Sequence, residues 1–427
     1  MFASLELKCK ILIFLLIVSI SGTAQEWDHQ LEGQVIRSYA INPWNTDILL
    51  IGTKSFAGDG RVYISQDAGN SWMATNNNKP LSDSTEDVQA VAFLNDSTYL
   101  AGCWKTGLYI SRDRGKNFER VKDFPSSDIR AIKVDPKKPE KVWLGTTTHG
   151  VIRSEDGLKS WILQTGDKQA SWDLELDHTK PNTLYSCLYD GGLGKSKDDG
   201  NSFKPLHKKE GIMVYDVLVH YDGRTWAVGG GDSTEFFLYR AFNGSGWKNL
   251  LLDVDYYEKA NYSCVHEVDG TVYVGSWDKG LLTYTDGQWD SIPEVDAATI
   301  TKIDYANNFL YVFTWGNGIY RQKKIVEPTV VIGDSLDVRK RQGWFWKMTS
   351  NMGIREMEMT LTSEDGVKLY SSSEFTNLRK LGNDIMIKFR ESKPASGEIS
   401  YHCSVTFTNG NWKQFKGKVV LPPEESK

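Results

Sequence analysis

The chain of 427 residues is poor in cysteine, with five in all. One of them, Cys9, lies near the N-terminus, and the others are scattered singly at Cys103, Cys187, Cys264 and Cys403. No two of these four lie at the short spacing of a Cys-x-x-Cys metal site, and their scatter argues against a disulfide framework. We therefore expect four buried free thiols, with no metal and no cofactor.

Stretches rich in Lys and Arg are also lacking, and the formal net charge is −5. A protein whose main partner is nucleic acid usually carries a basic patch or stripe. We therefore expect no nucleic-acid partner.

Long apolar runs are absent as well. The apolar run at residues 11–20 follows Lys8 and Lys10 and precedes a group of small residues at 21–24. A run of this length is too short to cross the roughly 30 Å core of a bilayer. The arrangement is typical of a cleaved secretory signal over residues 1–25. We expect an exported chain that is secreted, periplasmic or at the cell surface, with no transmembrane segment after cleavage.

The chain does contain a repeated turn motif. The pattern Ser-x-Asp-x-Gly-x-x-aromatic occurs at residues 65–72, 111–118 and 196–203, and a variant with Gly157 occurs at 154–161. The aspartate of each turn is placed to accept hydrogen bonds from turn amides, and the glycine can adopt the positive φ that the turn needs. We interpret these aspartates as turn acceptors rather than as catalytic acids or metal ligands: Asp67, Asp113, Asp156 and Asp198.

The spacing of these turns predicts the fold. Their first serines are 46, 43 and 42 residues apart, and each interval holds short alternating strands, as at 129–134, 142–145 and 151–153. Matching segments occur seven times, which predicts an all-β, seven-bladed β-propeller over residues 26–327. The seventh repeat lacks an outer strand, and residues 26–31 resemble the outer strand at 288–292. We expect this N-terminal segment to pair with the last repeat and close the ring.

The pattern changes in residues 328–427. Six or seven alternating strands follow within about 90 residues, which indicates a β-sandwich of immunoglobulin or fibronectin architecture. The Cys…Trp…Cys spacing of a true immunoglobulin domain is missing. We expect such an appendage to space, pack or dock rather than to catalyse.

The turn motif resembles the Asp box, also called the BNR repeat. The segment at 132–154 is similar to repeats of sortilin-like and xyloglucanase-like propellers. The resemblance covers about residues 26–324 and is strongest in the first four repeats. Sialidases, tandem-propeller xyloglucanases, sortilin-type receptors and a photosystem II assembly factor carry such boxes. The resemblance therefore implies the fold and leaves the function open.

This chain departs from the enzymes of that group. A sialidase needs three arginines; Arg37 and Arg130 occupy suitable strands, and no third arginine is evident. Sialidases also have six blades. The related xyloglucanases place their acids between two propellers, and this chain has one. The basic patch of the photosystem factor has no plain counterpart here.

A ligand-binding face follows from the topology. The Asp turns join the third and fourth strands, so the loops joining second and third strands lie at the opposite end. Aromatic residues begin four of those loops, and aligned first strands place a second set near the axis. The loop set is Trp104, Tyr189, Trp277 and Trp315, and the axial set is Arg37, Gln89, Arg130, Trp172, Tyr215, Tyr262 and Thr301. Such a concave face suits a sugar chain or a peptide, although aromatics also fill the gaps between blades.

Two functions fit these residues. The first is binding of a glycan or a protein at this face. The second is a polysaccharide-active enzyme, either a glycoside hydrolase with two carboxyl groups roughly 5 Å or 6.5–9.5 Å apart or a lyase with a Tyr or His base beside an arginine. The candidate catalytic residues are Asp173, Asp190, Asp216, Tyr215, Tyr262 and His149. No spacing in the sequence brings a particular pair together.

Overall fold

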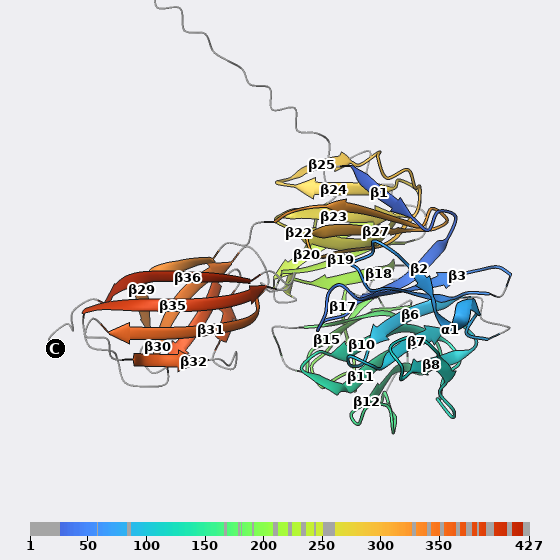
Figure 1. The fold of residues 1–427 in the computed structure, drawn as a ribbon, viewed down its shortest axis with the longest axis horizontal. Coiled ribbons are helices and arrows are strands. Elements are labelled where there is room, and N and C mark those ends of the chain that lie inside the picture. Colours follow the sequence, from blue (N-terminus) through green and yellow to red (C-terminus); the bar gives the residue numbers. More distant parts are fainter. Residues whose placement is uncertain are drawn as a thin grey trace, which may run out of the picture.

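The computed structural model is almost entirely β (Figure 1). It describes residues 26–421 apart from 58, 83–86, 166–168, 178–179, 181, 190–191, 208–211, 221–223, 232–235, 243–244, 251–260, 327–329, 340–342, 351–353, 364–367, 373–377, 382–383, 390–396 and 408–411. The expected signal at 1–25, the expected boundary at 327/328 and Asp190 lie outside the described residues.

Residues 27–323 form seven antiparallel sheets of four strands each among the described residues. Six of them follow the chain in order. The strands are β2 (Val35–Ile41), β3 (Leu49–Lys54), β4 (Val62–Ser65) and β5 (Met73–Ala74); β6 (Val88–Phe93), β7 (Tyr99–Cys103), β8 (Gly107–Ser111) and β9 (Glu119–Arg120); β10 (Ile129–Asp135), β11 (Lys138–Thr146), β12 (Gly150–Ser154) and β13 (Ile162–Leu163); β14 (Ser171–Leu176), β15 (Leu184–Leu188), β16 (Gly192–Ser196) and β17 (Lys204–His207); β18 (Ile212–Val219), β19 (Arg224–Gly231), β20 (Phe236–Phe242) and β21 (Ser245–Asn249); β22 (Tyr262–Val268), β23 (Thr271–Ser276), β24 (Leu281–Thr285) and β25 (Gln288–Ser291).

The seventh sheet combines the two ends of this region. It contains β26 (Ile300–Ala306), β27 (Phe309–Thr314), β28 (Ile319–Lys323) and the N-terminal strand β1 (Trp27–Gln30). Strand β1 pairs with β28 in antiparallel register, with Trp27 opposite Gln322 and Gln30 opposite Ile319. The predicted pairing of the N-terminal segment with the last repeat is confirmed.

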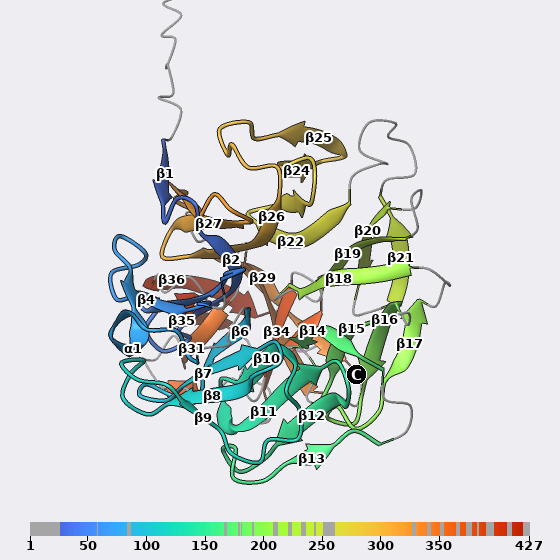
Figure 2. The ribbon, with the colours of Figure 1, turned by 90° about the vertical axis from the view of Figure 1, so that its right-hand side faces the viewer.

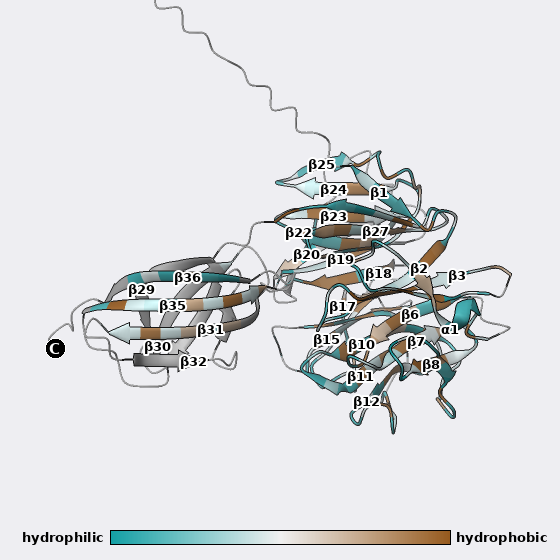
Figure 3. Ribbon diagram, in the orientation of Figure 1, coloured by the Kyte–Doolittle hydropathy of each residue, from teal (hydrophilic) through white to brown (hydrophobic). Residues whose placement is uncertain are grey.

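The first strands of the seven sheets stand side by side in a closed ring (Figure 2). Each contacts the first strands of both neighbouring sheets, and β26 contacts β2. Second strands such as β7 are buried along their whole length, because neighbouring sheets cover both of their faces. Outer strands such as β25 are mostly hydrophilic (Figure 3).

Small residues let the sheets approach one another. A Cβ on Gly102 would lie 2.5 Å from Cγ2 of Ile129 in the next sheet, and one on Gly275 would lie 2.8 Å from Cβ of Ile300. These glycines end second strands at matching places in their repeats. The recurring glycine therefore marks the point where one sheet packs on the next.

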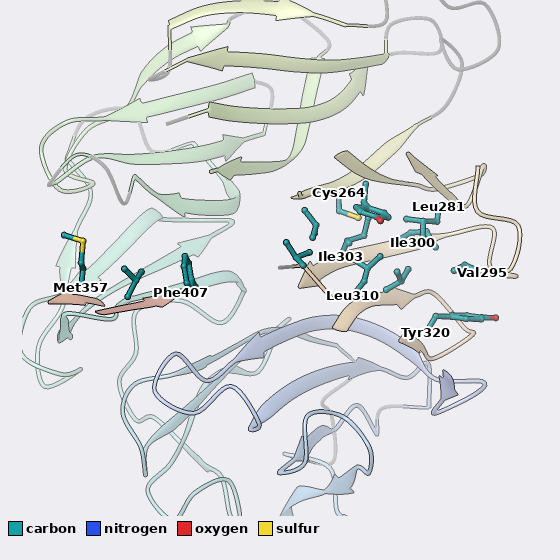
Figure 4. Close-up of a cluster of buried hydrophobic side chains, with 14 of the residues drawn as sticks. Cys264, Leu281, Val295, Ile300, Ile303, Leu310, Tyr320, Met357 and Phe407 are labelled. Carbon is teal, nitrogen blue, oxygen red and sulfur yellow. The ribbon is translucent and has the colours of Figure 1, made fainter. Parts of the chain in front are cut away.

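Hydrophobic clusters fill the spaces between the sheets. In Figure 4, Ile300, Ile303 and Leu310 of the seventh sheet lie near Cys264 and Leu281 of the sixth. Cys103, Cys187, Cys264 and Cys403 are all buried and unbridged, as expected. Burial raises the pKa of the Cys103 thiol to about 12, so this group stays protonated.

The repeated turns are held by their serine and aspartate side chains. In the second sheet, Asp113 Oδ1 accepts hydrogen bonds from the Ser111 hydroxyl at 2.7 Å and from the Asn117 amide at 2.9 Å. Ser111 Oγ in turn accepts the Gly115 amide at 2.9 Å, and Gly115 has a φ of 80°. The same contacts recur at Asp67, Asp156 and Asp198. The predicted role of these four aspartates as turn acceptors is confirmed.

The only helix among the described residues is α1 (Thr75–Asn78), a short turn in which Asn76 and Asn77 have positive φ values of 52° and 53°. It follows β5 and supports the next repeat, because Asn76 Oδ1 accepts the Phe118 amide at 2.7 Å. No described helix has the length and apolar character needed to cross a membrane.

Two further four-stranded sheets follow the ring. Figures 1 and 2 place them on one side of the ring, behind its centre in the second view. The chain leaves β28 at the same end of the ring as the turns with Asp67 and Asp113. The backbone amide of Lys324 donates there to the Asn308 carbonyl at 2.7 Å. One sheet contains β29 (Val330–Arg339), β30 (Gly343–Ser350), β34 (Asp384–Phe389) and β33 (Leu378–Leu381); the other contains β32 (Lys368–Ser372), β31 (Ile354–Ser363), β35 (Gly397–Phe407) and β36 (Trp412–Leu421).

We expect removal of residues 26–33 to lower the melting temperature by about 5 °C or more. The deletion exposes the edge of β28 and removes Asp28, which binds the buried Arg321 guanidinium at 2.7 Å. Calorimetry on chains that begin at residue 26 and at residue 34 tests this. Equal melting temperatures would contradict the closure.

Replacement of Asp113 by alanine should lower the free energy of unfolding by about 1–2 kcal/mol, the scale of a lost turn acceptor. Chemical denaturation measures the change. The carboxylate lies at the end of the ring away from the expected ligand-binding face, so we expect ligand binding to be unaffected. Loss of binding at unchanged stability would contradict the structural role.

Candidate functional site

Every first strand of the ring carries a β-bulge near its start. The pairing register shifts across one unpaired residue in each of the seven sheets, for example between Ile36 and Ser38 in β2. A bulge re-aims the side chain of the extra residue, and bulges are frequent beside functional sites. We call the seven unpaired residues the bulge ring: Arg37, Gln89, Arg130, Trp172, Tyr215, Ser263 and Thr301.

The bulge ring lines one axial cavity of about 480 Å³. Six of its members are residues that sequence alignment placed at the axis. The sixth sheet differs by one position, because its bulge falls at Ser263 rather than at Tyr262. Tyr262 is instead fully buried, with its ring stacked 6.0 Å from that of Trp289. The predicted position of Tyr262 at the axis is therefore wrong, because Ser263 lines the cavity in its place.

Arg130 is fixed by neighbours on every side. Its Nε donates to Thr147, Nη1 donates to Gln89 Oε1 at 2.8 Å, and Nη2 donates to Asp128 at 3.1 Å. Its guanidinium also lies 4.3 Å from the ring centroid of Trp172. Each nitrogen thus has a partner within the chain, so Arg130 holds Trp172 and Gln89 in place.

Arg37 is held more loosely. Its Nε donates to Asp87 at 3.2 Å, and its guanidinium carbon lies 5.3 Å from the Trp315 ring centroid. Gln89 connects the two arginines, since its Nε2 donates to Asp87 at 3.0 Å. Cations and aromatic rings therefore continue around the cavity from one sheet to the next.

The four loop aromatics lie at the same end as the bulge ring. Their backbone amides donate to carbonyls just before or at the first strands, at 2.8–3.1 Å, namely Trp104 to Asp87, Tyr189 to Ala170, Trp277 to Asn261 and Trp315 to Thr299. This is the end opposite the repeated turns, which contact the loops between first and second strands. We call this end the mouth.

These aromatics differ in their exposure to the cavity. Trp277 lines it and packs edge-on against Trp315 and Tyr215, with centroids 6.4 and 6.2 Å away. Tyr189 is 46% exposed at the rim and lies 5.9 Å from Trp172. Trp104 lies beside the ammonium of Lys105, at 3.8 Å from the ring centroid. None of the four is fully buried between sheets.

Two acids and a lysine lie one step deeper in the cavity. Asp173 and Asp216 are the residues that follow the bulges of the fourth and fifth sheets, and Lys302 follows the bulge of the seventh. The Lys302 ammonium donates to both carboxylates at 2.7 Å. Asp216 also accepts the Val265 amide at 2.9 Å and shares a hydrogen bond with Asp173. The two predicted acids therefore meet at one cation that sequence reasoning missed.

The electrostatics of this cluster separate the two acids. Burial raises the pKa of Asp216 to about 6, with Lys302 opposing the rise and Asp173 adding to it. Burial acts in the same direction on Asp173, but Lys302 and then Lys133 outweigh it and lower the pKa of that carboxyl. One carboxyl of the pair therefore holds a proton more readily than the other.

The remaining catalytic candidates are less well placed. His149 Nδ1 is 2.8 Å from the Thr148 hydroxyl, and His149 does not line the cavity. Tyr215 lines the cavity, and burial raises its pKa, so it remains a protonated phenol. Of these two candidates, only Tyr215 lines the cavity.

Comparisons with known proteins were made at the level of family, sequence and structure. No protein-family model matches the chain. A probable oligoxyloglucan-reducing end-specific xyloglucanase of Neosartorya fischeri is 23% identical over 219 residues, which cover 45% of this chain and 23% of that protein. The chain therefore spans about a quarter of the length of that relative.

Solved structures match over longer stretches. The GH74 xyloglucanase of Xanthomonas campestris matches with a TM-score of 0.54 and 14% identity, over 91% of this chain and 75% of that one. A structure of YCF48 bound to D1 peptide matches with a TM-score of 0.53 and 12% identity, over 70% of this chain and 97% of that one. The fold is propeller-like. The seven sheets stand around the axis in a propeller-like arrangement, and the mouth is one of the two ends of the ring.

The Asp173–Asp216 pair predicts that the stability of the chain depends on pH. Because the pKa of Asp216 is raised in the folded state, the folded chain binds more protons than the unfolded chain between about pH 4 and pH 6. The contribution of Asp216 to stability therefore falls as the pH rises through this range. Relative to the parent, Asp216→Asn should gain about 2 kcal/mol of stability between pH 4 and pH 7.

Denaturation of both proteins at several pH values measures this difference. Asp59→Asn is a matched control, because Asp59 is a half-exposed carboxylate beside Arg61 and does not line the cavity. A difference between parent and Asp216→Asn that does not change with pH would contradict the raised pKa.

Proposed function

We propose that the chain is an exported seven-bladed β-propeller of the Asp-box type over residues 26–327, followed by a β-sandwich of immunoglobulin type over 328–427, and that its mouth binds a glycan. The observation that carries the proposal is the group of arginine and aromatic side chains that line a cavity of about 480 Å³, namely Arg37, Arg130, Trp172, Tyr215 and Trp277. Aromatic faces bind the apolar C–H faces of sugar rings, and fixed polar groups between them bind hydroxyl groups.

The arrangement of the side chains supports binding rather than blade packing. Trp277 lines the cavity, Trp315 supports Arg37, and Trp172 supports Arg130. Half-buried tryptophans on short loops at an open cavity leave apolar surface that a ligand would cover. Polar side chains such as Gln89 lie between them and can donate to sugar hydroxyls.

The position of the second region is compatible with this role. Its strands follow β28, which ends on the face opposite the mouth. The mouth would therefore stay accessible while the sandwich spaces the propeller or docks it to another surface.

The comparisons support a polysaccharide ligand in general terms. A relative that is named as a xyloglucanase and a similar structure that is a GH74 xyloglucanase share the propeller-like fold. We carry over only the class of ligand, because the match covers 23% of that relative. A peptide is the alternative ligand, since the similar YCF48 structure contains one.

A polysaccharide-active enzyme is the second candidate, and the Asp173–Asp216 pair is the observation that favours it. One protonated and one ionised carboxyl in a cavity can serve as acid and base on a glycosidic bond. In the unliganded chain both carboxylates form an ion pair with Lys302. Catalysis would require a substrate to displace Lys302 from at least one of them. Release of reducing ends from a glycan that the mouth binds, lost in Asp216→Asn, would establish the enzyme.

Loss of a mouth tryptophan should weaken glycan binding without unfolding the chain. We expect Trp277→Ala or Trp315→Ala to reduce affinity by about 1–3 kcal/mol, the scale of a lost aromatic anchor, with little change in melting temperature. A glycan array on residues 26–427, followed by calorimetry with the best oligosaccharide, measures the effect.

Trp161→Ala is the matched control. Trp161 precedes β13 and packs edge-on against Phe124, 4.8 Å between centroids, away from the cavity. Its loss should leave affinity unchanged. The proposal fails if no glycan binds, or if both mouth variants unfold and no ligand has been found.

A further inference from the structure

Two cations share one buried carboxylate at the mouth. Asp87 is 2% exposed, with Arg37 Nε at 3.2 Å and the Lys54 ammonium at 3.6 Å. No other carboxylate forms a described ion pair with either cation. Among the described residues, one positive charge in this part of the mouth therefore has no carboxylate partner.

The donors of these cations are largely unused. Arg37 bonds through Nε, and its two terminal nitrogens have no partner among the described residues. The Lys54 ammonium lies too far from Asp87 for a hydrogen bond and has none to any other described group. This contrasts with Arg130, whose three nitrogens are all bonded within the chain.

Aromatic rings fix the two cations in place. The Lys54 ammonium lies 5.0 Å from the ring centroid of Phe56, 5.9 Å from that of Trp104 and 5.4 Å from that of Trp315. The same Trp315 ring carries the Arg37 guanidinium. The side chains of Arg37 and Lys54 are only 19% and 17% exposed, so little conformational freedom remains to be lost when a ligand binds.

The described acids deeper in the cavity contact groups other than Arg37 and Lys54. Asp173 and Asp216 face Lys302, Glu175 faces Lys133 at 2.7 Å, and Asp304 faces His266 at 3.6 Å. The two cations that share Asp87 therefore lie apart from these acids, on the side of the mouth formed by the first and last blades.

We propose that Arg37 and Lys54 bind an anionic group on the glycan, a carboxylate of a uronic acid or a sulfate ester, so that the ligand is an acidic glycan. The proposal rests on glycan binding at the mouth. The two terminal nitrogens of an arginine match the two oxygens of a carboxylate or sulfate, and the lysine adds a second charge. The sugar ring that carries the anion lies against Trp315 or Phe56. Arg130 is a positioning residue that acts through Trp172.

The test compares three trisaccharides by calorimetry on residues 26–427. They are trigalacturonate, a sulfated trisaccharide and a neutral trisaccharide of glucose. We expect at least one anionic sugar to bind about tenfold or more tightly than the neutral one. Its affinity should fall between about 50 mM and about 500 mM NaCl, while that of the neutral sugar stays level. The two anionic sugars decide between carboxylate and sulfate.

Variants separate the two arginines. Arg37→Gln should reduce the affinity for the anionic sugar to about that of the neutral sugar and change the neutral affinity by less than about threefold. The matched control Arg130→Gln should weaken all three sugars by a similar factor, because it loosens Trp172. Lys54→Gln gives a second measurement if Arg37→Gln does not fold.

Equal affinity for all three sugars, or an equal loss for all three in Arg37→Gln, would overturn the acidic ligand while glycan binding stands. Weakening of all three sugars by Trp277→Ala would show that the mouth is still the binding site in that case. If no sugar binds and a peptide with a free C-terminal carboxylate binds through Arg37, both the acidic glycan and the proposed function are overturned.

Discussion

The structure depends on the close approach of each second strand to the first strand of the next sheet. A glycine lies one residue before the end of β7, β11 and β23, and a Cβ at Gly102 or Gly275 would overlap a side chain of the following sheet. This contact brings all seven first strands to one axis. Since every first strand also carries a bulge at its start, the same packing that makes the ring delivers seven side chains to one cavity.

The closing seam shows how the ends of the region contribute. Arg321 of β28 binds Asp28 of β1, and it also reaches the Ala68 carbonyl and Asn70 in the repeated turn of the first sheet. One buried guanidinium therefore joins the last sheet, the N-terminal strand and the first sheet. Closure of this kind pairs the edge of β28 that would otherwise be exposed.

The chemistry of the mouth follows from which donors remain unused. Arg37 and Arg130 occupy equivalent bulge positions, yet Arg130 is bonded to three partners and Arg37 to one. The difference arises from the neighbours of Arg130. Asp128 and Thr147 lie in loops beside β10 and β11, and Gln89 lies in β6 of the preceding sheet. Two arginines at equivalent positions can thus have different roles. Arg130 positions neighbouring side chains, and Arg37 keeps donors that a ligand can use.

The sequence by itself determined the repeat, the strands, the repeated turns and the N-terminal pairing, because all of these depend on local patterns and on a constant period. It also determined which loops share the mouth, since strand connections alternate between ends. In residues 328–427 the sequence predicted six or seven strands, and the described residues contain eight. Strands β29 and β33 were missed, because their sequences show little alternation of apolar and polar residues.

The sequence placed six of the seven bulge-ring residues at the axis, and only the tertiary structure decided which residue of β22 faces it. The bulge at Ser263 rather than Tyr262 leaves no local signal, because packing between sheets places it. The meeting of Lys302 with Asp173 and Asp216 joins residues 129 and 86 positions apart. Contacts across the axis depend on how seven sheets close into a ring, and no local pattern in the chain records them.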